Sequence, residues 1–148
     1  MVTLRNFEPG DAPALQKSQY PDMSLSDIEV LIRDWGKKEV QGRYFEQFAI
    51  VDGENIVGMV SLWQLASHTI SCGPEIFPAC RRKGYAKAAM PLALELARTR
   101  GFRIALHQVA VSNAASVALH RSLGFESDEY IYRNKKGREV LIFCKSLI

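Results

Sequence analysis

The sequence has few of the residues that hold disulfide-rich or metal-stabilised folds together. Its 148 residues include three histidines and three cysteines, Cys72, Cys80 and Cys144, with no Cys-x-x-Cys pair. An odd number of scattered cysteines argues against a disulfide framework, and with so few histidines it also argues against structural zinc. We therefore expect three free thiols in or near the core and no metal ion.

A long apolar run is also missing. No stretch approaches the roughly 20 apolar residues that a membrane-spanning helix needs. Residues 1–9 carry charge and proline where a signal peptide would have its apolar region. We expect a cytoplasmic protein with no membrane partner. The net charge of +3 is too small to indicate a nucleic-acid partner, and none is expected.

What is present is the composition of an ordinary globular domain. Apolar residues make up 47% of the chain and charged residues 24%, and no repeat or Pro/Gly/Ser-rich linker divides it. We expect one domain over residues 1–148. Periodicity and turn residues predict strands at 4–7, 45–51, 56–63, 67–77, 102–111, 130–132 and 140–143, and helices at 12–20, 24–36, 84–100 and 114–123.

The order of these elements predicts a mixed α/β (α+β) sheet of about seven strands with helices on both faces. Strand, helix and strand between 67 and 111 imply a parallel crossover, whereas hairpins join the other strands. Gly73-Pro74 combines a flexible residue with one that has no N–H, so we expect a bulge there and a splay between the fourth and fifth strands.

The helix at 84–100 has two notable features. Pro91 lies inside it, and proline removes a donor and crowds the preceding turn, so we expect a kink there. Its expected buried face is the apolar row at spacings of three and four residues, which consists of Tyr85, Ala89, Leu92 and Leu96.

The segment from Pro78 to Lys87 joins a strand to this helix. The first N–H groups of a helix have no internal partners and lie at the positive end of its dipole, so they can receive phosphate oxygens. Gly84 and Ala86 leave room for such a ligand, and the basic residues around them are Arg81, Arg82, Lys83 and Lys87. Neither a Walker loop nor a Rossmann glycine pattern is present, which disfavours a nucleoside triphosphatase or a dinucleotide oxidoreductase.

Two motifs resemble those of the GNAT family of N-acetyltransferases. The first is Arg81-Arg82-Lys83-Gly84-Tyr85-Ala86, which is similar to the family's pyrophosphate loop, Gln/Arg-x-x-Gly-x-Gly/Ala. The second runs from Asn113 to Phe125 and is similar to the family's Asn-x-x-Ser/Ala-x-x-Leu-Tyr-x-x-x-Gly-Phe helix. The element order also matches over residues 1–148, although residues 1–45 carry no diagnostic motif.

The resemblance implies a GNAT-like fold and acetyl-CoA as the co-substrate. Its pyrophosphate would lie on the amides of Arg82 to Lys87, with Arg81 beside them, and its pantetheine would lie along Glu75, Ile76 and Phe77. The predicted splay would open a wedge for it. A backbone N–H near Ile76 would then stabilise the oxyanion that forms on the thioester.

The reaction that the resemblance implies is direct attack of a neutral amine on the thioester. Asn113, Ser116 and His120 would form one polar helical stripe facing it. Asn113 can cap that helix, bind the cofactor, or do both. His120 stands where many family members have Tyr, the acid for the departing thiolate. We consider it as that donor and, alternatively, as a histidine with a structural role only.

Glu75 is the acidic residue nearest the expected cofactor strand, and its carboxylate could relay the amine proton through water. His107 and His68 are alternative bases or packing residues. No sequence neighbour activates Cys72 or Cys80 as an acyl-carrying nucleophile. The aromatic residues that we expect either to line an acceptor pocket or to pack in the core are Trp35, Trp63, Tyr44 and Phe45.

The sequence thus predicts an acetyl-CoA-dependent N-acetyltransferase that acts on a primary amine of a small-molecule or protein acceptor. The alternative from another class is an acyl-CoA binding or sensing module without catalysis. The departure at His120 and the absence of a convincing base favour this alternative. A monomer and a homodimer both fit the sequence.

Overall fold

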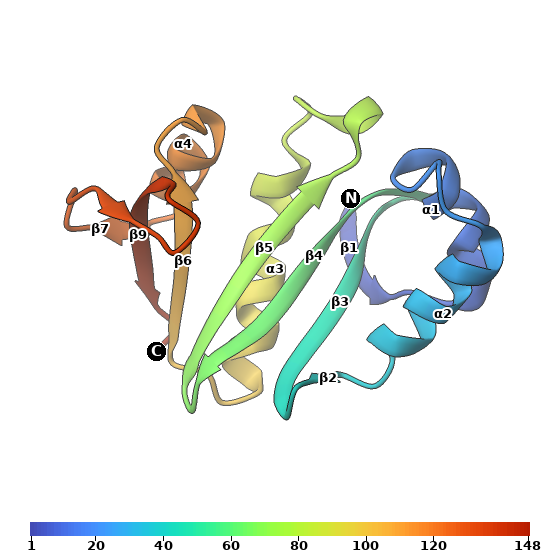
Figure 1. The fold of residues 1–148 in the computed structure, drawn as a ribbon, viewed down its shortest axis with the longest axis horizontal. Helices are drawn as coiled ribbons and strands as arrows, with labels where there is room; N and C mark the ends of the chain where they lie inside the picture. The colour runs from blue at the N-terminus through green and yellow to red at the C-terminus, as the bar shows by residue number, and fades with distance from the viewer.

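The computed structural model describes residues 1–148 and places helices on both faces of a central sheet (Figure 1). In chain order the elements are β1 (Val2–Asn6), η1 (Pro9–Asp11), α1 (Ala12–Ser18), α2 (Leu25–Trp35), β2 (Glu39–Val40), β3 (Arg43–Asp52), β4 (Asn55–Ala66), β5 (Thr69–Ile76), η2 (Pro78–Cys80), α3 (Tyr85–Thr99), β6 (Ile104–Ala110), α4 (Ala114–Ser122), β7 (Glu126–Ser127), β8 (Tyr132–Arg133) and β9 (Glu139–Ser146).

The sheet has the order β1-β3-β4-β5-β6-β9-β7, with β2 and β8 paired to β3 and β9. Only β5 and β6 run parallel, and α3 forms the crossover between them. The other neighbouring strands are antiparallel. The mixed sheet that the element order predicted is confirmed.

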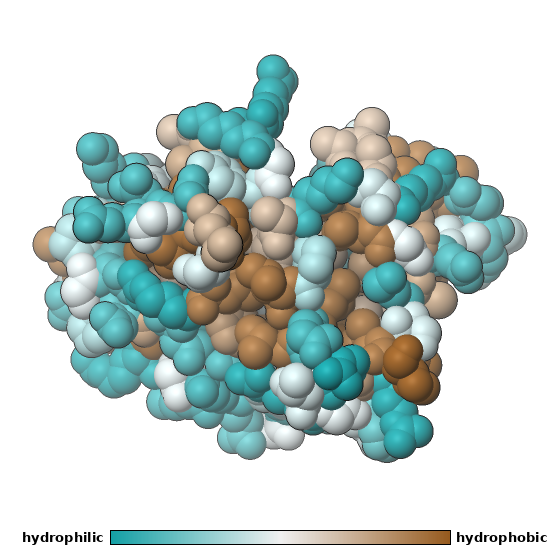
Figure 2. All heavy atoms as spheres, turned by 180° about the vertical axis from the view of Figure 1, so that it is seen from behind, coloured by the Kyte–Doolittle hydropathy of each residue, from teal (hydrophilic) through white to brown (hydrophobic).

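The two faces of the sheet carry separate apolar clusters. Along β3, Phe48 and Ile50 face the cluster that α3 covers, while Ala49 and Val51 face the cluster that α1 and α2 cover. This alternation follows from the two-residue period of a strand, and β3 is apolar at both phases because both of its faces are buried. Figure 2 shows the molecule from the α3 side, with apolar atoms gathered across its middle.

Local sequence signals set the ends of several helices. The Ser24 hydroxyl accepts the N–H of Asp27 at 3.1 Å and caps α2, and Gly36 is the C-cap of the same helix. Gly124 follows α4 with a φ of +84°, a conformation that favours glycine. These predicted boundaries hold because the interactions that fix them lie within a few residues.

The pairing of β5 with β6 is short. It covers only Thr69 with Ile104 and Ile70 with Ala105, after which the two strands diverge. Because the structure has the additional two-residue strand β2, the fourth and fifth predicted strands are β5 and β6. The splay that the sequence predicted between them is present. Toward β4, however, β5 stays in register through Gly73-Pro74 to Ile76, so no bulge interrupts the strand there.

The direction of the backbone groups explains why Pro74 leaves that ladder intact. Phe77 donates its N–H to Val57 of the β4 side at 3.0 Å. Because N–H directions alternate along a strand, Glu75 also faces β4, whereas Cys72, Pro74 and Ile76 face β6. The missing donor of Pro74 therefore falls on the edge that has no partner strand.

The buried face of α3 differs from the one predicted. Ala89, Met90, Ala93, Leu94 and Ala97 are its buried residues, whereas Leu92 is 41% exposed. Pro91 lies on the exposed side, and α3 continues through it without a break. An apolar residue on the surface cannot be told from an apolar residue in the core by sequence, so the predicted buried face of this helix is wrong.

The cysteines lie at three different depths. Cys72 is buried, and burial raises the pKa of its thiol to about 12. Cys80 is half-buried, and Cys144 is exposed, which corrects the expectation that all three lie in or near the core. No helix is long and apolar enough to cross a membrane.

Glu46 is a charged residue inside the sheet, only 1% exposed. Its carboxylate lies 2.9 Å from Arg100 and 3.4 Å from Lys38, accepts from the Asn6 amide at 3.0 Å, and accepts from the Tyr44 hydroxyl. Burial raises the pKa of this carboxyl, but the two hydrogen bonds and two cations outweigh it and leave the pKa below its ordinary value. The carboxylate links β1, β3 and the end of α3.

We predict that Glu46→Gln lowers the free energy of unfolding by about 1–3 kcal/mol at pH 7, because charge-assisted hydrogen bonds are lost. A lowered folded pKa stabilises the fold above the unfolded value of about 4.3, and this contribution disappears as pH falls through the folded pKa. Urea unfolding should therefore show a smaller difference between wild type and variant at pH 3 than at pH 7.

The matched control is Glu95→Gln, which removes a surface carboxylate paired with Arg98. Exposed pairs contribute about 0–1 kcal/mol, so this change should be nearly silent. A difference for Glu46→Gln that is the same at both pH values would contradict the assigned charge.

Candidate functional site

The segment before α3 presents a row of unpaired backbone donors. None of the backbone N–H groups from Arg81 to Lys87 has an acceptor within the protein, and the first helical bond of α3 is from Ala88 to Gly84. Arg82 and Gly84 have φ values of +65° and +80°. Alternating backbone conformations of this kind turn successive N–H groups toward one point and create an anion-binding concavity.

The side chains of this loop strengthen its preference for an anion. No ion pair engages Arg81, Arg82, Lys83 or Lys87, so their charges stay available. A Cβ placed on Gly84 would meet nothing within 4 Å, which leaves the space beside its amide open. In Figure 2 the upper edge of the molecule is notched between this loop and α4.

The splayed edge of β5 continues from this loop. The N–H groups of Cys72 and Ile76 face the gap, and the Ile76 carbonyl accepts from Arg81 Nε at 3.1 Å. Glu75 and Phe77, also predicted along the cofactor, turn their main-chain groups toward β4. The Glu75 carboxylate instead accepts from the Gln19 amide at the end of α1, and the Phe77 side chain is buried against α1 and α2.

Asn113 begins α4 as its N-cap. Its side-chain oxygen accepts the N–H of Ser116 at 3.1 Å, while the residue itself stays exposed. Of the two readings that the sequence left open, the capping role is therefore present. Cofactor binding by the Asn113 amide remains a prediction.

His120 is 1% exposed and is not on an open polar stripe. Its ring stacks on His107 at a centroid distance of 5.2 Å and packs against Phe125 and Phe143. Its Nδ1 lies 2.8 Å from the Ser116 carbonyl, which can only accept, so Nδ1 carries the proton. Burial lowers the pKa of His120 and outweighs the hydrogen bond to the Ser116 carbonyl, which raises it. The other ring nitrogen, Nε2, has no hydrogen-bond partner.

His107 reaches across the start of the splay. Its Nδ1 lies 3.0 Å from the Ser71 hydroxyl of β5, one residue beyond the last parallel pair. Burial, assisted by the neighbouring His120, lowers the pKa of His107 to about 4. The sequence named His107 as a candidate but gave no signal for Ser71, because the two residues meet only when β5 and β6 lie side by side.

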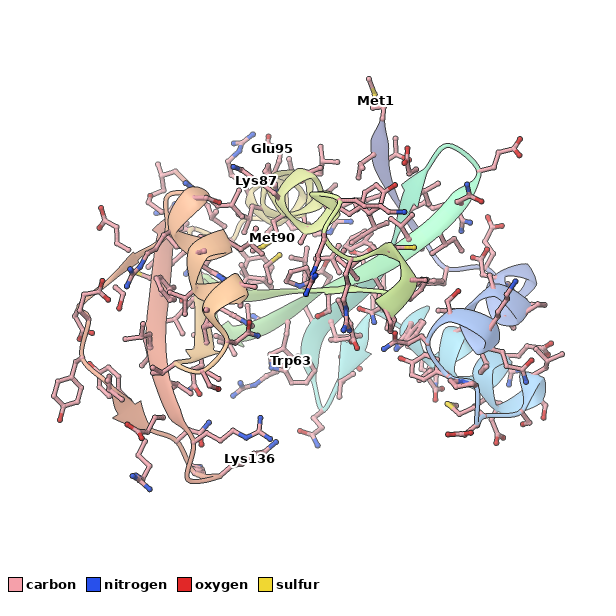
Figure 3. All side chains as sticks on the ribbon, turned by 90° about the horizontal axis from the view of Figure 1, so that it is seen from above. Met1, Trp63, Lys87, Met90, Glu95 and Lys136 are labelled. Atoms are coloured by element: carbon pink, nitrogen blue, oxygen red, sulfur yellow. The ribbon has the colours of Figure 1, made fainter.

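The aromatic candidates divide between the two faces. Trp63 pairs edge-on with Phe45 at 5.5 Å, and in Figure 3 Trp63 lies across the sheet from Lys87 and Glu95 of α3. Trp35 packs on Phe7 beneath α2, and Tyr44 stacks on Phe102 on the α3 side. That Trp63 and Phe45 line an acceptor site stays a prediction.

His68 lies in the turn between β4 and β5, where its carbonyl accepts the N–H groups of Arg103 and Ile104. This turn is at the end of β5 opposite the loop of unpaired amides. The structure therefore brings His107, but not His68, toward the gap.

Comparison with known proteins identifies the fold and the family. The acetyltransferase (GNAT) family model matches residues 11–125. No curated protein sequence matches this chain. A solved structure of spermidine N-acetyltransferase from Vibrio cholerae, in complex with CoA and spermine, has a TM-score of 0.77 at 21% identity and covers 99% of this chain and 95% of its own.

Two further structures have the same fold. A probable acetyltransferase has a TM-score of 0.81 at 20% identity, covering 98% of this chain and 92% of its own. A dodecameric spermidine N-acetyltransferase from Vibrio cholerae has a TM-score of 0.78 at 20% identity, covering 99% and 94%.

We predict that the His107 ring titrates with a midpoint near pH 4. The unfolded chain takes up this proton at about pH 6.5, so folding stability should decline as pH falls from about 6.5 toward the folded midpoint. NMR titration of the imidazole C–H signals, assigned with His107→Gln, measures it. A midpoint at or above 6.5 would show that the ring is solvated.

Proposed function

This chain belongs to the acetyltransferase (GNAT) family, and from that premise we propose that it transfers an acetyl group to an amine, and how its own residues hold acetyl-CoA and promote the transfer. The observation that carries the proposal is the unbroken row of free amides from Arg81 to Lys87. It lies at the end of a strand whose outer edge has no partner strand beyond Ile70.

The amides of Arg82 to Lys87 bind the pyrophosphate, and the basic side chains around them neutralise its charge. The residues present fit this group, because the donors have no acceptor within the protein and the space at Gly84 is open. The pantetheine arm lies along β5 between Ile76 and the divergent β6, in the position of an added strand.

Acetyl-CoA supplies an activated thioester, and the chain supplies donors and a proton route. The Ile76 N–H points into the gap and stabilises the oxyanion as the amine adds to the thioester carbon. Pro74 has no N–H, which leaves Cys72 and Ile76 as the donors on this part of the edge. Glu75, exposed on the acceptor side, accepts the amine proton through water.

His120 is the candidate donor to the departing thiolate, under two conditions that the structure sets: the buried Nε2 must come into contact with the sulfur, and the ring must be charged. Its neutral ring carries the proton on Nδ1, so donation from Nε2 requires the imidazolium form. Because burial lowers its pKa, that form is scarce at neutral pH and increases as the solution becomes acidic. The amine loses one proton through water to Glu75, and the sulfur gains one proton from His120, so the number of protons balances.

The direct test combines calorimetry with acetyl-CoA and a thiol-release assay with a broad panel of primary amines. Heat of binding together with amine-dependent thiol release is expected. Binding without release across the panel would favour the sensing module, and no binding of CoA would contradict the site.

Gly84→Asp should weaken CoA affinity by about tenfold or more, because it adds a negative charge beside the amides and a Cβ at a φ of +80°. Gly42→Asp is the matched control, since Gly42 has a φ of +76° and a Cβ on it would also meet nothing within 4 Å. It precedes β3 at the end opposite Asp52, the residue that Tyr85 contacts. Calorimetry should show a loss for the first variant only. Equal dissociation constants for the two variants would remove the loop from the site.

His120→Phe should lower kcat about tenfold or more while leaving CoA affinity within about twofold, because it fills the buried volume but donates no proton. The ratio of wild-type to variant kcat should rise as pH falls from 8 to 6, since acid populates the imidazolium. A ratio that stays at one throughout would show that thiolate departure needs no help from this ring.

A further inference from the structure

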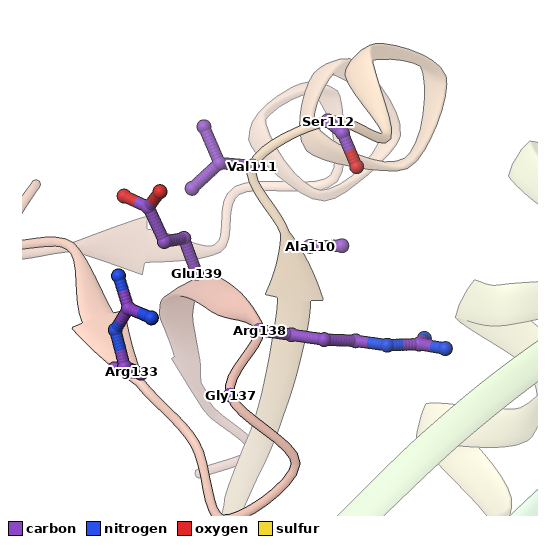
Figure 4. A pocket seen from close by; sticks show the side chains of 7 residues that line it. All are labelled: Ala110, Val111, Ser112, Arg133, Gly137, Arg138 and Glu139. Atoms are coloured by element: carbon purple, nitrogen blue, oxygen red, sulfur yellow. The ribbon is translucent and has the colours of Figure 1, made fainter.

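A cavity of about 510 Å³ opens where β6 ends, between that end and the β8–β9 hairpin (Figure 4). Ala110 and Ser112 line it from the chain that leads into α4, and Arg133, Arg138 and Glu139 line it from the hairpin. None of these residues belongs to β5, but β6 is the strand that diverges from β5, so the cavity borders the splay on its β6 side.

The cavity wraps around the end of β6, so its lining residues project to both faces of the sheet. Val109 belongs to the cluster beneath α3, and Ala110, the next residue of the strand, therefore projects to the other face. Figure 3 agrees, because Lys136 at the hairpin tip and Trp63 lie on one side of the sheet, and Lys87 and Glu95 lie on the other. This is the side on which Glu75 meets the end of α1.

The hairpin carries cations without acidic partners. No ion pair engages Arg133, Lys135, Lys136 or Arg138. The tip that carries them is held in shape by the Asn134 side-chain oxygen, which accepts the N–H groups of Lys136 and Arg138 at 3.0 Å each. Gly137 takes a φ of +76° there.

The orientation of the side chains leaves one cation free for a ligand. In Figure 4, Glu139 projects on the same side of the cavity as Arg133, whereas Arg138 extends the other way, toward β5 and the splay. Ser112 lies at the α4 end of the same space. A guanidinium and a hydroxyl that face one cavity form a binding site for carboxylate or phosphate oxygens.

We propose that the acceptor is a small primary amine that also carries an anionic group, a carboxylate or a phosphate. The amine reaches the thioester beside Glu75, and Arg138, with Ser112, binds the anionic end. This proposal rests on the proposed function and names its substrate class.

The same charges disfavour a polyamine, which the Vibrio cholerae neighbour binds. A second ammonium group near Arg138 and Lys136 would be repelled. Glu139 is the one acid that lines the cavity, and it projects on the side of Arg133, away from Arg138. Glu126 and Asp128 line a separate pocket with Tyr132, and the Tyr132 hydroxyl donates to Asp128 at 2.6 Å. They do not line the cavity at the splay.

The test measures kcat/KM with amines of similar length: butylamine, 1,4-diaminobutane, 4-aminobutanoate and 3-aminopropyl phosphate. At least one anionic amine should exceed butylamine by about tenfold or more, and 1,4-diaminobutane should fall below it. The carboxylate and phosphate arms show which anion fits. Preference for 1,4-diaminobutane, or turnover of acidic peptides only, would overturn the proposal.

Arg138→Gln should lower kcat/KM for the preferred anionic amine by about 10-fold to 100-fold, chiefly through KM, and change butylamine by less than about twofold. Arg103→Gln is the control, because Arg103 is an exposed cation at the opposite end of β6. An unchanged KM for the anionic amine in Arg138→Gln would overturn the assignment of Arg138.

The two levels of the argument fail differently. Turnover of amines without preference for an anionic one removes this inference and leaves the proposed function intact. Binding of CoA without turnover of any amine removes both.

Discussion

The separation of β5 from β6 is the structural constraint on which the site depends. The strands pair over two residues each and then part, so the facing N–H and C=O groups beyond Ile70 and Ala105 have no strand partner. Backbone groups inside a protein need partners, and a free edge in the middle of a sheet is a place for an extended ligand to supply them. The loop before α3 and the start of α4 lie at the same end.

Two neighbouring features keep this gap open without loosening the sheet. The ladder to β4 holds β5 in register to Ile76, and Pro74 is tolerated because its nitrogen faces the gap. At the start of the divergence, Ser71 and His107 are linked across the strands, and His107 stacks on the buried His120. The gap is thus bounded by one regular ladder and one polar contact.

Basic groups gather on both sides of the gap, which the net charge of +3 does not reveal. Free amides and basic side chains collect before α3, and a second set of unpaired cations collects on the β8–β9 hairpin. The buried charge of Glu46, in contrast, is fully partnered and holds strands together. In this protein the unpaired donors indicate ligand sites, whereas the fully partnered charge of Glu46 stabilises the fold.

The sequence alone determined what depends on neighbours within one turn: the mixed order of elements, the cap at Asn113, the glycine at the start of α3, and the loop that identifies the family. Only the tertiary structure decided which face of α3 is buried, that Cys144 is exposed, that His120 is enclosed, and that Ser71 meets His107. Local bonding is fixed by residue type and spacing, whereas burial and contacts between strands depend on how distant segments pack, which no short window of sequence contains.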